Sequence, residues 1–273
     1  MHPIRQPAVA GAFYPGQPHA LLNDVTAMLA QAQALADADT HNPAPKALIV
    51  PHAGYIYSGA TAALAYARLA PARTTIRRVV LLGPVHRVPV RGLALPGVAA
   101  FATPLGTVGL DQAAMTRLSP LRQVVVNRAA HALEHSLEVQ LPFLQSVLDD
   151  FTLVPLAVGD ATPEDVAQVL EALWGGPETL IVISSDLSHF LPYPTAQAVD
   201  RATVQHIMNL ESTLTHEQAC GGTPVNGLLL AARRHHLQPR LLGLCNSGDT
   251  AGDKNRVVGY AALAFEETAH GLH

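Results

Sequence analysis

The sequence has little of what would place it in several common classes of protein. Only two cysteines, Cys220 and Cys245, occur in 273 residues, which is too few for a disulfide-stapled fold, so we expect free thiols or ligands. Charged residues make up 14% of the chain and the net charge is −4, with the basic residues scattered, so nothing indicates a nucleic-acid-binding surface. No apolar run reaches the roughly 18 to 20 residues of a membrane span, and the first residues lack the apolar core of a signal peptide. We therefore expect a cytoplasmic protein that binds neither nucleic acid nor membrane.

What the chain does have is enough apolar residues, 49% of the total, for one large domain with a buried core. Two domains are possible at this length but are not required. Short apolar runs alternate with segments of helical periodicity, which is typical of an open α/β sheet. The runs that predict strands are Lys46–Val50, Val79–Leu82, Val124–Val126, Leu153–Val158, Leu180–Ser184, Leu241–Leu244 and Val257–Phe265.

Helices are predicted between these runs from periodicity, caps and proline. The predicted helices cover residues 19–36, 59–69 with Ser58 as N-cap, a segment from Asp111, a segment from Thr162 to about Trp174, 195–210 and 224–236. Residues 3–16 form an irregular lead-in, rich in glycine and proline. The punctuated stretch from Arg91 to Gly109 predicts a hairpin inserted at an edge of the sheet.

Polar residues that can bind metal follow three of the predicted strands. His52 comes after Lys46–Val50, and His86 comes after Val79–Leu82. Asp186 and His189 come after Leu180–Ser184. The carboxyl ends of neighbouring parallel strands lie at one edge of a sheet, and ligands of open α/β folds bind there. The pattern predicts one shared site.

Imidazole is the commonest ligand of transition metals, and a divalent cation needs three or more converging donors. His52 and His86 provide two donors. The third is left open by spacing alone, and Cys220 would lie on a turn beside a helix N-terminus, where a thiolate is favoured. The candidates for the third donor are Cys220, Cys245, Asp186, His189, His135 and Glu134.

Each of these residues also has an ordinary structural interpretation. A histidine at a strand end can serve as a hydrogen-bonded structural residue, and Asp186 can cap a helix or close a turn. Glu134 and His135 can begin a solvated helix, and buried cysteines often behave as apolar side chains. The metal site is therefore favoured by the pattern as a whole and by no single residue.

An ordered set of motifs along nearly the whole chain resembles the Memo family, also named AmmeMemoRadiSam system protein B. The motifs are Gly11–Pro15, Pro51–Tyr55, Gly83–His86, Glu134–Ser136 with Glu138 and Gln140–Pro142, Ser184–Asp186 with His189, and Val258–Tyr260. The family is similar in fold to the class III non-heme iron extradiol dioxygenases. The resemblance thus implies a single α/β domain over residues 1–273, with a central, mostly parallel or mixed β-sheet flanked by helices.

The resemblance also implies which residues form the site. By its motifs, the two-His, one-Cys metal set of the family corresponds to His52, His86 and Cys220. Asp186 and His189 line the same pocket as catalytic candidates, and Glu134, His135 and Tyr55 surround it. Cys245 is not a ligand in the family, and we place it at a strand end near the pocket.

The function implied is that of a metal-binding oxidoreductase, dioxygenase-like, acting on a small substrate, with aromatic compounds as first candidates. Iron(II) is the first choice of cofactor, with copper or zinc as alternatives because a thiolate is softer than a carboxylate. His189 would shuttle a proton while Asp186 orients a ligand. Two other classes stay open: a zinc-type hydrolase, and a redox or signalling adaptor that binds metal or peptide without turnover. The family name implies association with AMMECR-type and radical S-adenosylmethionine proteins.

Overall fold

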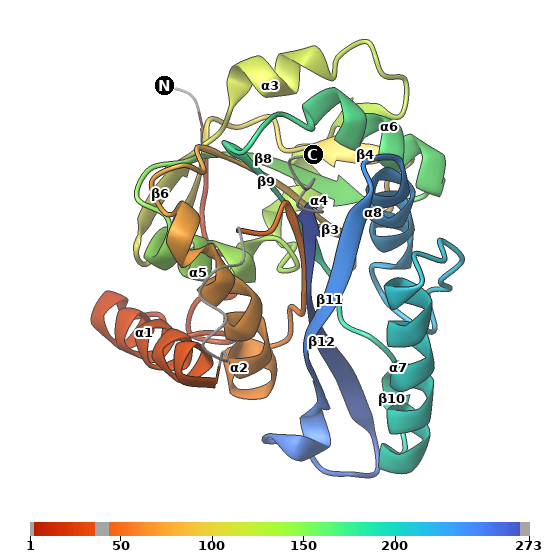
Figure 1. Ribbon diagram of the computed structural model, residues 1–273. Helices are drawn as coiled ribbons and strands as arrows, with labels where there is room; N and C mark the ends of the chain where they lie inside the picture. Colours follow the sequence, from red (N-terminus) through yellow and green to blue (C-terminus); the bar gives the residue numbers. More distant parts are fainter. Residues whose placement is uncertain (1–2, 36–43, 268–273) are drawn as a thin grey trace, which may run out of the picture.

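Nine strands of the described chain form one large mixed sheet (Figure 1). The computed structural model describes residues 3–35 and 44–267. In spatial order the strands are β10 (His189–Leu191), β12 (Val257–Glu267), β2 (Ala47–Val50), β9 (Thr179–Ser184), β3 (Arg78–Pro84), β8 (Thr152–Val158), β4 (Leu93–Leu95) and β7 (Val124–Val126), while β11 (Leu237–Asn246) pairs with β12. The central four strands, β2, β9, β3 and β8, are parallel neighbours, whereas β12 and β4 run antiparallel to them. The predicted mostly parallel or mixed sheet is confirmed.

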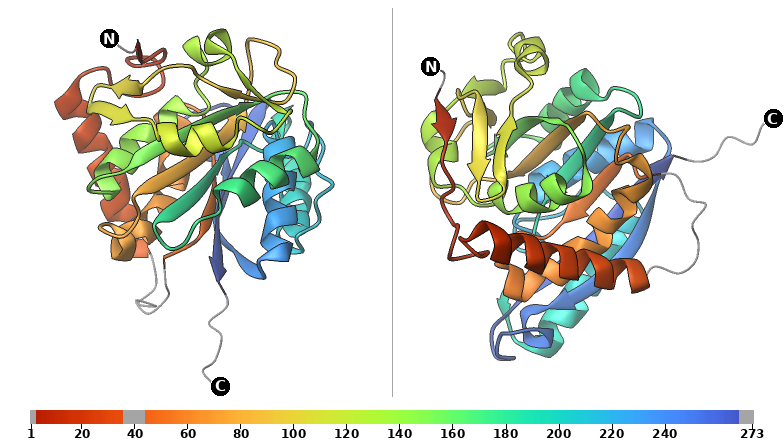
Figure 2. Two further views of the ribbon diagram at one scale, coloured as in Figure 1. Left: turned by 90° about the horizontal axis from the view of Figure 1, so that it is seen from above. Right: turned by 90° about the vertical axis from the view of Figure 1, so that its left-hand side faces the viewer.

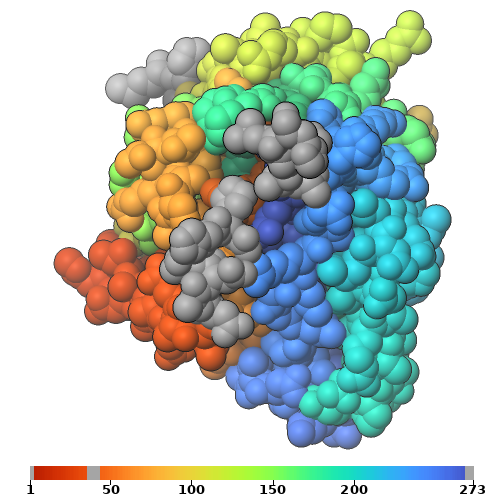
Figure 3. All heavy atoms as spheres, in the orientation of Figure 1, coloured from red at the N-terminus to blue at the C-terminus, as the bar shows by residue number. Residues whose placement is uncertain are grey.

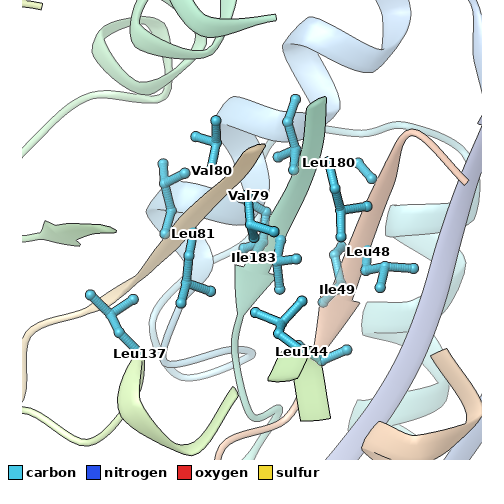
Figure 4. Close-up of a cluster of buried hydrophobic side chains, with 14 of the residues drawn as sticks. Leu48, Ile49, Val79, Val80, Leu81, Leu137, Leu144, Leu180 and Ile183 are labelled. Carbon is cyan, nitrogen blue, oxygen red and sulfur yellow. The ribbon is translucent and has the colours of Figure 1, made fainter. Parts of the chain in front are cut away.

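The central strands are buried on both faces, which is why they appear in the sequence as continuous apolar runs. Every residue of β2 and β9 is buried, as are all but the first residue of β3 and of β8. Figure 4 shows side chains from β2, β3 and β9 gathered with Leu137 and Leu144. Burying each such aliphatic side chain contributes about 1.5 to 3 kcal/mol, so this cluster gives the strand ends a rigid base.

Helices cover both faces of the sheet. On one face α1 (Pro18–Leu35), α2 (Tyr55–Tyr66) and α5 (Leu141–Val147) pack together, and on the other α6 (Pro163–Leu173) packs on α8 (Gly222–Arg234) (Figure 1). α7 (Tyr193–Met208) packs along β11 and β12, beside which it lies in the space-filling view (Figure 3). The shorter elements are α3 (Gln112–Arg117), α4 (Arg128–Ala132) and the 3₁₀ turns η1 (Ala67–Ala72), η2 (Glu138–Gln140) and η3 (Ser247–Asp249). Among the described residues, none of the helices combines the length and apolarity that crossing a bilayer requires.

Several predicted boundaries are confirmed. Thr162 caps α6 in a reciprocal pair with Asp165, and Pro163 occupies the first helical position. Asp111 caps α3 by accepting from the backbone N–H of Ala114. These ends follow from local chemistry, because a capping side chain and its partner lie three residues apart.

The predicted start of α2 is wrong. The helix begins at Tyr55, with Gly54 at the cap position, and the Ser58 hydroxyl donates to the Ala53 carbonyl instead. The Tyr55 N–H donates to the Phe13 carbonyl at 2.7 Å, a contact with the lead-in that a local pattern does not reveal. The early start leaves only residues 51–54 between β2 and α2, so His52 is held in a short turn.

The expected hairpin exists, but most of it belongs to a different sheet. β5 (Ala100–Thr103) and β6 (Gly106–Gly109) pair antiparallel, and β1 (Ile4–Arg5) adds to β5 in parallel, which gives a separate three-stranded sheet. The right-hand view of Figure 2 shows this small sheet above α1. Only β4, from the start of the predicted stretch, joins the edge region of the large sheet.

Candidate metal centre

Three neighbouring strands bring their polar residues to one edge of the sheet. β9 lies between β2 and β3, and all three run parallel. His52 lies two residues beyond the end of β2, His86 two residues beyond β3, and Asp186 two residues beyond β9. The shared site expected from the sequence is therefore formed by the topology of the sheet.

The ligand atoms of His52, His86 and Cys220 all lie within 4.8 Å of one another. We refer to these three residues as the donor group. Cys220 comes from the turn before α8, where its N–H donates to the Asp186 carbonyl at 3.3 Å. Its Sγ lies 3.3 Å from Nε2 of His52, and the two imidazole rings meet edge to face with centroids 5.2 Å apart. Two imidazoles and a sulfur are donors that suit iron, copper or zinc, so the set fits a transition metal.

A second group of potential donors, His86, Glu134 and His135, is equally compact. The Glu134 carboxylate, however, already accepts four hydrogen bonds, from the N–H and Nδ1 of His86 at 2.6 and 2.9 Å and from the N–H groups of His135 and Ser136 at 2.9 Å each. Burial opposes its charge, but the bonds from His86 and these N–H groups prevail and lower the pKa to about 2. Glu134 is thus an ionised anchor for His86, not a solvated helix start.

The contact with Glu134 also sets the orientation of His86. A carboxylate that is ionised can only accept, so the Nδ1 of His86 carries the proton and Nε2 keeps its lone pair. The side chain of His86 is 30% exposed, whereas His52 is 2% exposed. His86 is therefore the donor on the solvent side.

His52 is held by the strand end of β9. Its N–H donates to Oδ1 of Asp186 at 2.7 Å and its Nδ1 lies 2.9 Å from the Ser184 hydroxyl. Burial, with smaller effects from nearby charges, lowers the pKa of His52 to about 3. The imidazole is neutral at pH 7, which is the form that binds a metal.

The predicted thiolate character of Cys220 is wrong for the metal-free protein. Burial and the neighbouring Asp186 raise the pKa of its thiol to about 12. α8 begins at Gly222 with no charge on its N-terminal turn, and its dipole does not offset the loss of water around the sulfur. The thiol proton would leave only when a metal binds.

Asp186 lies beside His52, and His189 is close enough for its charge to affect the pKa of both His52 and Asp186. Asp186 is buried, which raises its pKa, and its Oδ2 lies 3.9 Å from Nε2 of His52. His189 donates Nδ1–H to the Leu187 carbonyl at 2.9 Å, so that in the neutral ring the lone pair is on Nε2. The next residue, Phe190, has a φ of 59° and is 59% exposed. A positive φ is rare for a bulky residue and is typical of functional sites.

The other predicted site residues differ in how close they come. His135 stacks on His86 with centroids 4.7 Å apart and packs on Phe13 at 4.8 Å; burial and His52 lower its pKa to about 4. Tyr55 instead donates its hydroxyl to the Val139 carbonyl at 2.6 Å and is outside the donor group. Cys245 lies on β11, 3.0 Å from the Thr61 hydroxyl, and is likewise outside the group.

Two residues at the site escaped the sequence analysis as individual candidates. Ser184 is fully buried and contacts His52. Gln140, which the sequence pattern suggests is an exposed polar residue, is only 1% exposed and donates to Ser184 at 2.9 Å. Both lie within the motifs noted above, which was the only available signal. A groove of about 540 Å³ lies nearby, with Phe13, the packing partner of His135, in its wall.

Known proteins similar to this chain are found by sequence over nearly its whole length. Residues 5–264 match the family model described as Memo-like protein. Relatives described as MEMO1 family proteins include one from Ignicoccus hospitalis, 35% identical over 96% of this chain and 98% of the relative, and one from Metallosphaera sedula, 32% identical over 96% and 99%. A solved structure of an uncharacterized protein from Escherichia coli K12 covers 80% of this chain and 98% of its own at 15% identity, with a TM-score of 0.49, which is too distant to carry an argument.

Proposed function

The chain belongs to the Memo-like protein family, and from that premise we propose that it is a metal-dependent redox protein, dioxygenase-like, that acts on a small substrate. The observation that carries the proposal is the convergence of ligand atoms from His52, His86 and Cys220 within 4.8 Å of one another. A bound metal would supply a Lewis acid and an electron-transfer centre at the edge of the sheet.

Iron(II) is the metal we propose first. Its support is the similarity in fold between this family and the class III extradiol dioxygenases, together with a donor set that iron accepts. Cys220 stands where those enzymes use a carboxylate, so copper and zinc are tested beside iron. The thiolate formed on binding would also make the site sensitive to oxidants.

The residues of this chain divide the work between holding and proton transfer. His52, His86 and Cys220 hold the metal, while Glu134 keeps the ring of His86 in place through Nδ1. His189 is the proposed proton acceptor, because the Leu187 carbonyl occupies its Nδ1 and leaves the Nε2 lone pair for a substrate hydroxyl. Asp186 orients the turn that carries His52 by accepting its N–H.

The substrate class we propose is a small aromatic compound, on the strength of the family resemblance. Proton removal by His189 requires a substrate with an acidic hydroxyl, and catechols meet both conditions. Functional association with AMMECR-type and radical S-adenosylmethionine proteins is proposed on the same resemblance.

The test is elemental analysis of protein purified without oxygen, paired with an oxygen electrode. We expect about one iron per chain in the wild type, loss of that iron in Cys220→Ser and His86→Ala, and its retention in Cys245→Ser. Cys245→Ser is the matched control, since it removes the other thiol, which lies outside the donor group. Oxygen uptake should depend on iron and on an added catechol.

Other outcomes would replace the proposal. Zinc in place of iron, with turnover that needs no oxygen, would favour the hydrolase. Metal that is bound without any turnover would favour the adaptor. Protein that takes up no metal anaerobically would end every version based on this site.

A further inference from the structure

We propose that Ser184 is a positioning residue that holds His52 in the tautomer protonated on Nδ1, so that Nε2 is the atom presented to a metal. The part that concerns metal rests on the proposed function, whereas the tautomer is a property of the metal-free chain. The hydrogen-bond donors and acceptors around the Ser184 hydroxyl determine this tautomer.

The Ser184 hydroxyl has three neighbours and a single proton. They are the Ser136 carbonyl at 2.6 Å, Nε2 of Gln140 at 2.9 Å and Nδ1 of His52 at 2.9 Å. A carbonyl can only accept, so the hydroxyl proton points to Ser136. The two remaining lone pairs of the oxygen must receive protons from Gln140 and His52.

The side-chain amide of Gln140 cannot be turned the other way. Its Nε2 lies 2.9 Å from the Pro51 carbonyl, and its Oε1 accepts from the Tyr66 hydroxyl at 2.8 Å. A reversed amide would set its own oxygen against the Pro51 carbonyl. Neither the Pro51 carbonyl nor the Ser184 oxygen would then receive a proton from Gln140. Gln140 therefore donates to Ser184, and the only group left to fill the last lone pair is Nδ1–H of His52.

The network is buried, so the direction of each hydrogen bond is set by the protein groups themselves. Ser184 and Tyr66 are fully buried, Gln140 is 1% exposed and His52 is 2% exposed. Leaving a polar group without a partner in such a buried network costs about 1 to 3 kcal/mol. One donor for each acceptor is therefore the only arrangement in which no group is left without a partner.

With Nδ1 protonated, the lone pair of the neutral imidazole lies on Nε2, 3.3 Å from Sγ of Cys220. The two histidines of the donor group thus reach the same tautomer by different means. His86 uses the carboxylate of Glu134, whereas the more deeply buried His52 uses a hydroxyl, which fixes the tautomer without adding a charge.

The first test is nitrogen NMR of metal-free protein labelled with ¹⁵N-histidine. The signals of His52 are assigned by their absence from a His52→Asn variant. We expect the proton on Nδ1. A proton found on Nε2 of wild-type His52 would overturn the proposal, and this measurement needs no Ser184 variant that folds and no metal that binds.

The second test compares Ser184→Ala with Thr203→Val. Both hydroxyls are fully buried and donate to a carbonyl, but Thr203 donates to Val199 within α7, away from His52. In Ser184→Ala we expect the Nε2-protonated tautomer to appear and the Kd for Co²⁺ to rise about tenfold to a hundredfold. Thr203→Val should keep Nδ1–H, with a Kd within about threefold of the wild type.

An unchanged tautomer in Ser184→Ala, with a Kd no weaker than that of Thr203→Val, would also overturn the proposal. A wild type that does not bind Co²⁺ would count against the metal-dependent function and leave the NMR result to decide the role of Ser184. The two failures are therefore distinguishable.

Discussion

Replacing Glu134 by glutamine should cost the metal-free protein about 3 kcal/mol of unfolding free energy at pH 7. The pKa of Glu134 falls from 4.5 to about 2 in the folded chain, and each unit is worth about 1.4 kcal/mol. The side chain is only 3% exposed, so solvent screens little of this. Oε1 accepts from three N–H donors and Oε2 from one, so the new amide nitrogen would settle at Oε2, against the N–H of His86.

The assay is urea unfolding of both proteins, without metal, at pH 7 and near pH 3. Because folding lowers the pKa of Glu134, its contribution is fully present above pH 4.5 and is lost as the pH falls through about 2. The gap between wild type and Glu134→Gln should therefore shrink markedly at the lower pH. Glu164→Gln, at an exposed position in the first turn of α6, is the control and should cost less than about 1 kcal/mol.

A loss below about 1 kcal/mol in Glu134→Gln at pH 7 would contradict this expectation, because it would mean that the four N–H donors do not depend on an ionised carboxylate. So would a gap that stays constant with pH. The same variant should bind Co²⁺ about tenfold to a hundredfold more weakly, since the ring of His86 loses its anchor.

Three further predictions concern other parts of the same architecture. Gly83→Ala would place a Cβ 2.9 Å from the Ser136 hydroxyl and should lower the free energy of unfolding, measured with urea, by about 1 to 3 kcal/mol. Gly109→Ala, where an added Cβ meets no atom within 4 Å, should change this free energy little. Equal effects of the two variants would contradict the close packing at Gly83. Calorimetry of metal binding in two buffers at pH 7.5 should show about one proton released per metal bound, because the pKa of the Cys220 thiol is about 12 and the thiol must lose its proton to bind. Cys220→Ala should release none. Equal proton release by the two proteins would mean that the thiol is not a ligand. Burial lowers the pKa of His131 from 6.5 to about 4, so the contribution of the neutral imidazole to stability is present above pH 6.5 and is lost as the pH falls toward 4. The free energy of unfolding of the wild type, relative to that of His131→Gln, should drop by about 2 to 3 kcal/mol between pH 7.5 and 4.5. A difference that stays constant with pH would mean that the pKa of His131 is not lowered by folding.

The residues that could be predicted from the sequence are those whose place follows from strand direction. His52, His86 and Asp186 each follow a buried apolar run, and parallel neighbours bring such residues together whatever the loops do. The cap of α6 was equally predictable, because Thr162 and Asp165 interact across three residues.

What could not be predicted depends on contacts between distant segments. Ser58 looks like a cap, but the start of α2 is decided by Phe13, far earlier in the chain. Gln140 looks like a surface residue, but its partners are Pro51, Tyr66 and Ser184. The thiol chemistry of Cys220 likewise depends on burial and on Asp186, neither of which is a property of its own turn.

The separation in sequence between the residues of the donor group has a consequence for how the proposed metal centre would be assembled in a cell. His52 and Cys220 are 168 residues apart, and a ribosome adding about 5 to 20 residues per second needs roughly 8 to 34 seconds to synthesise that interval. During this time the nascent chain contains His52 but not Cys220, and for most of the interval it also lacks β9, which ends at Ser184 and lies between β2 and β3 in the folded sheet. If the proposed metal binds, loading of the complete site would therefore follow synthesis of Cys220, and a metal captured earlier would be held without the sulfur ligand.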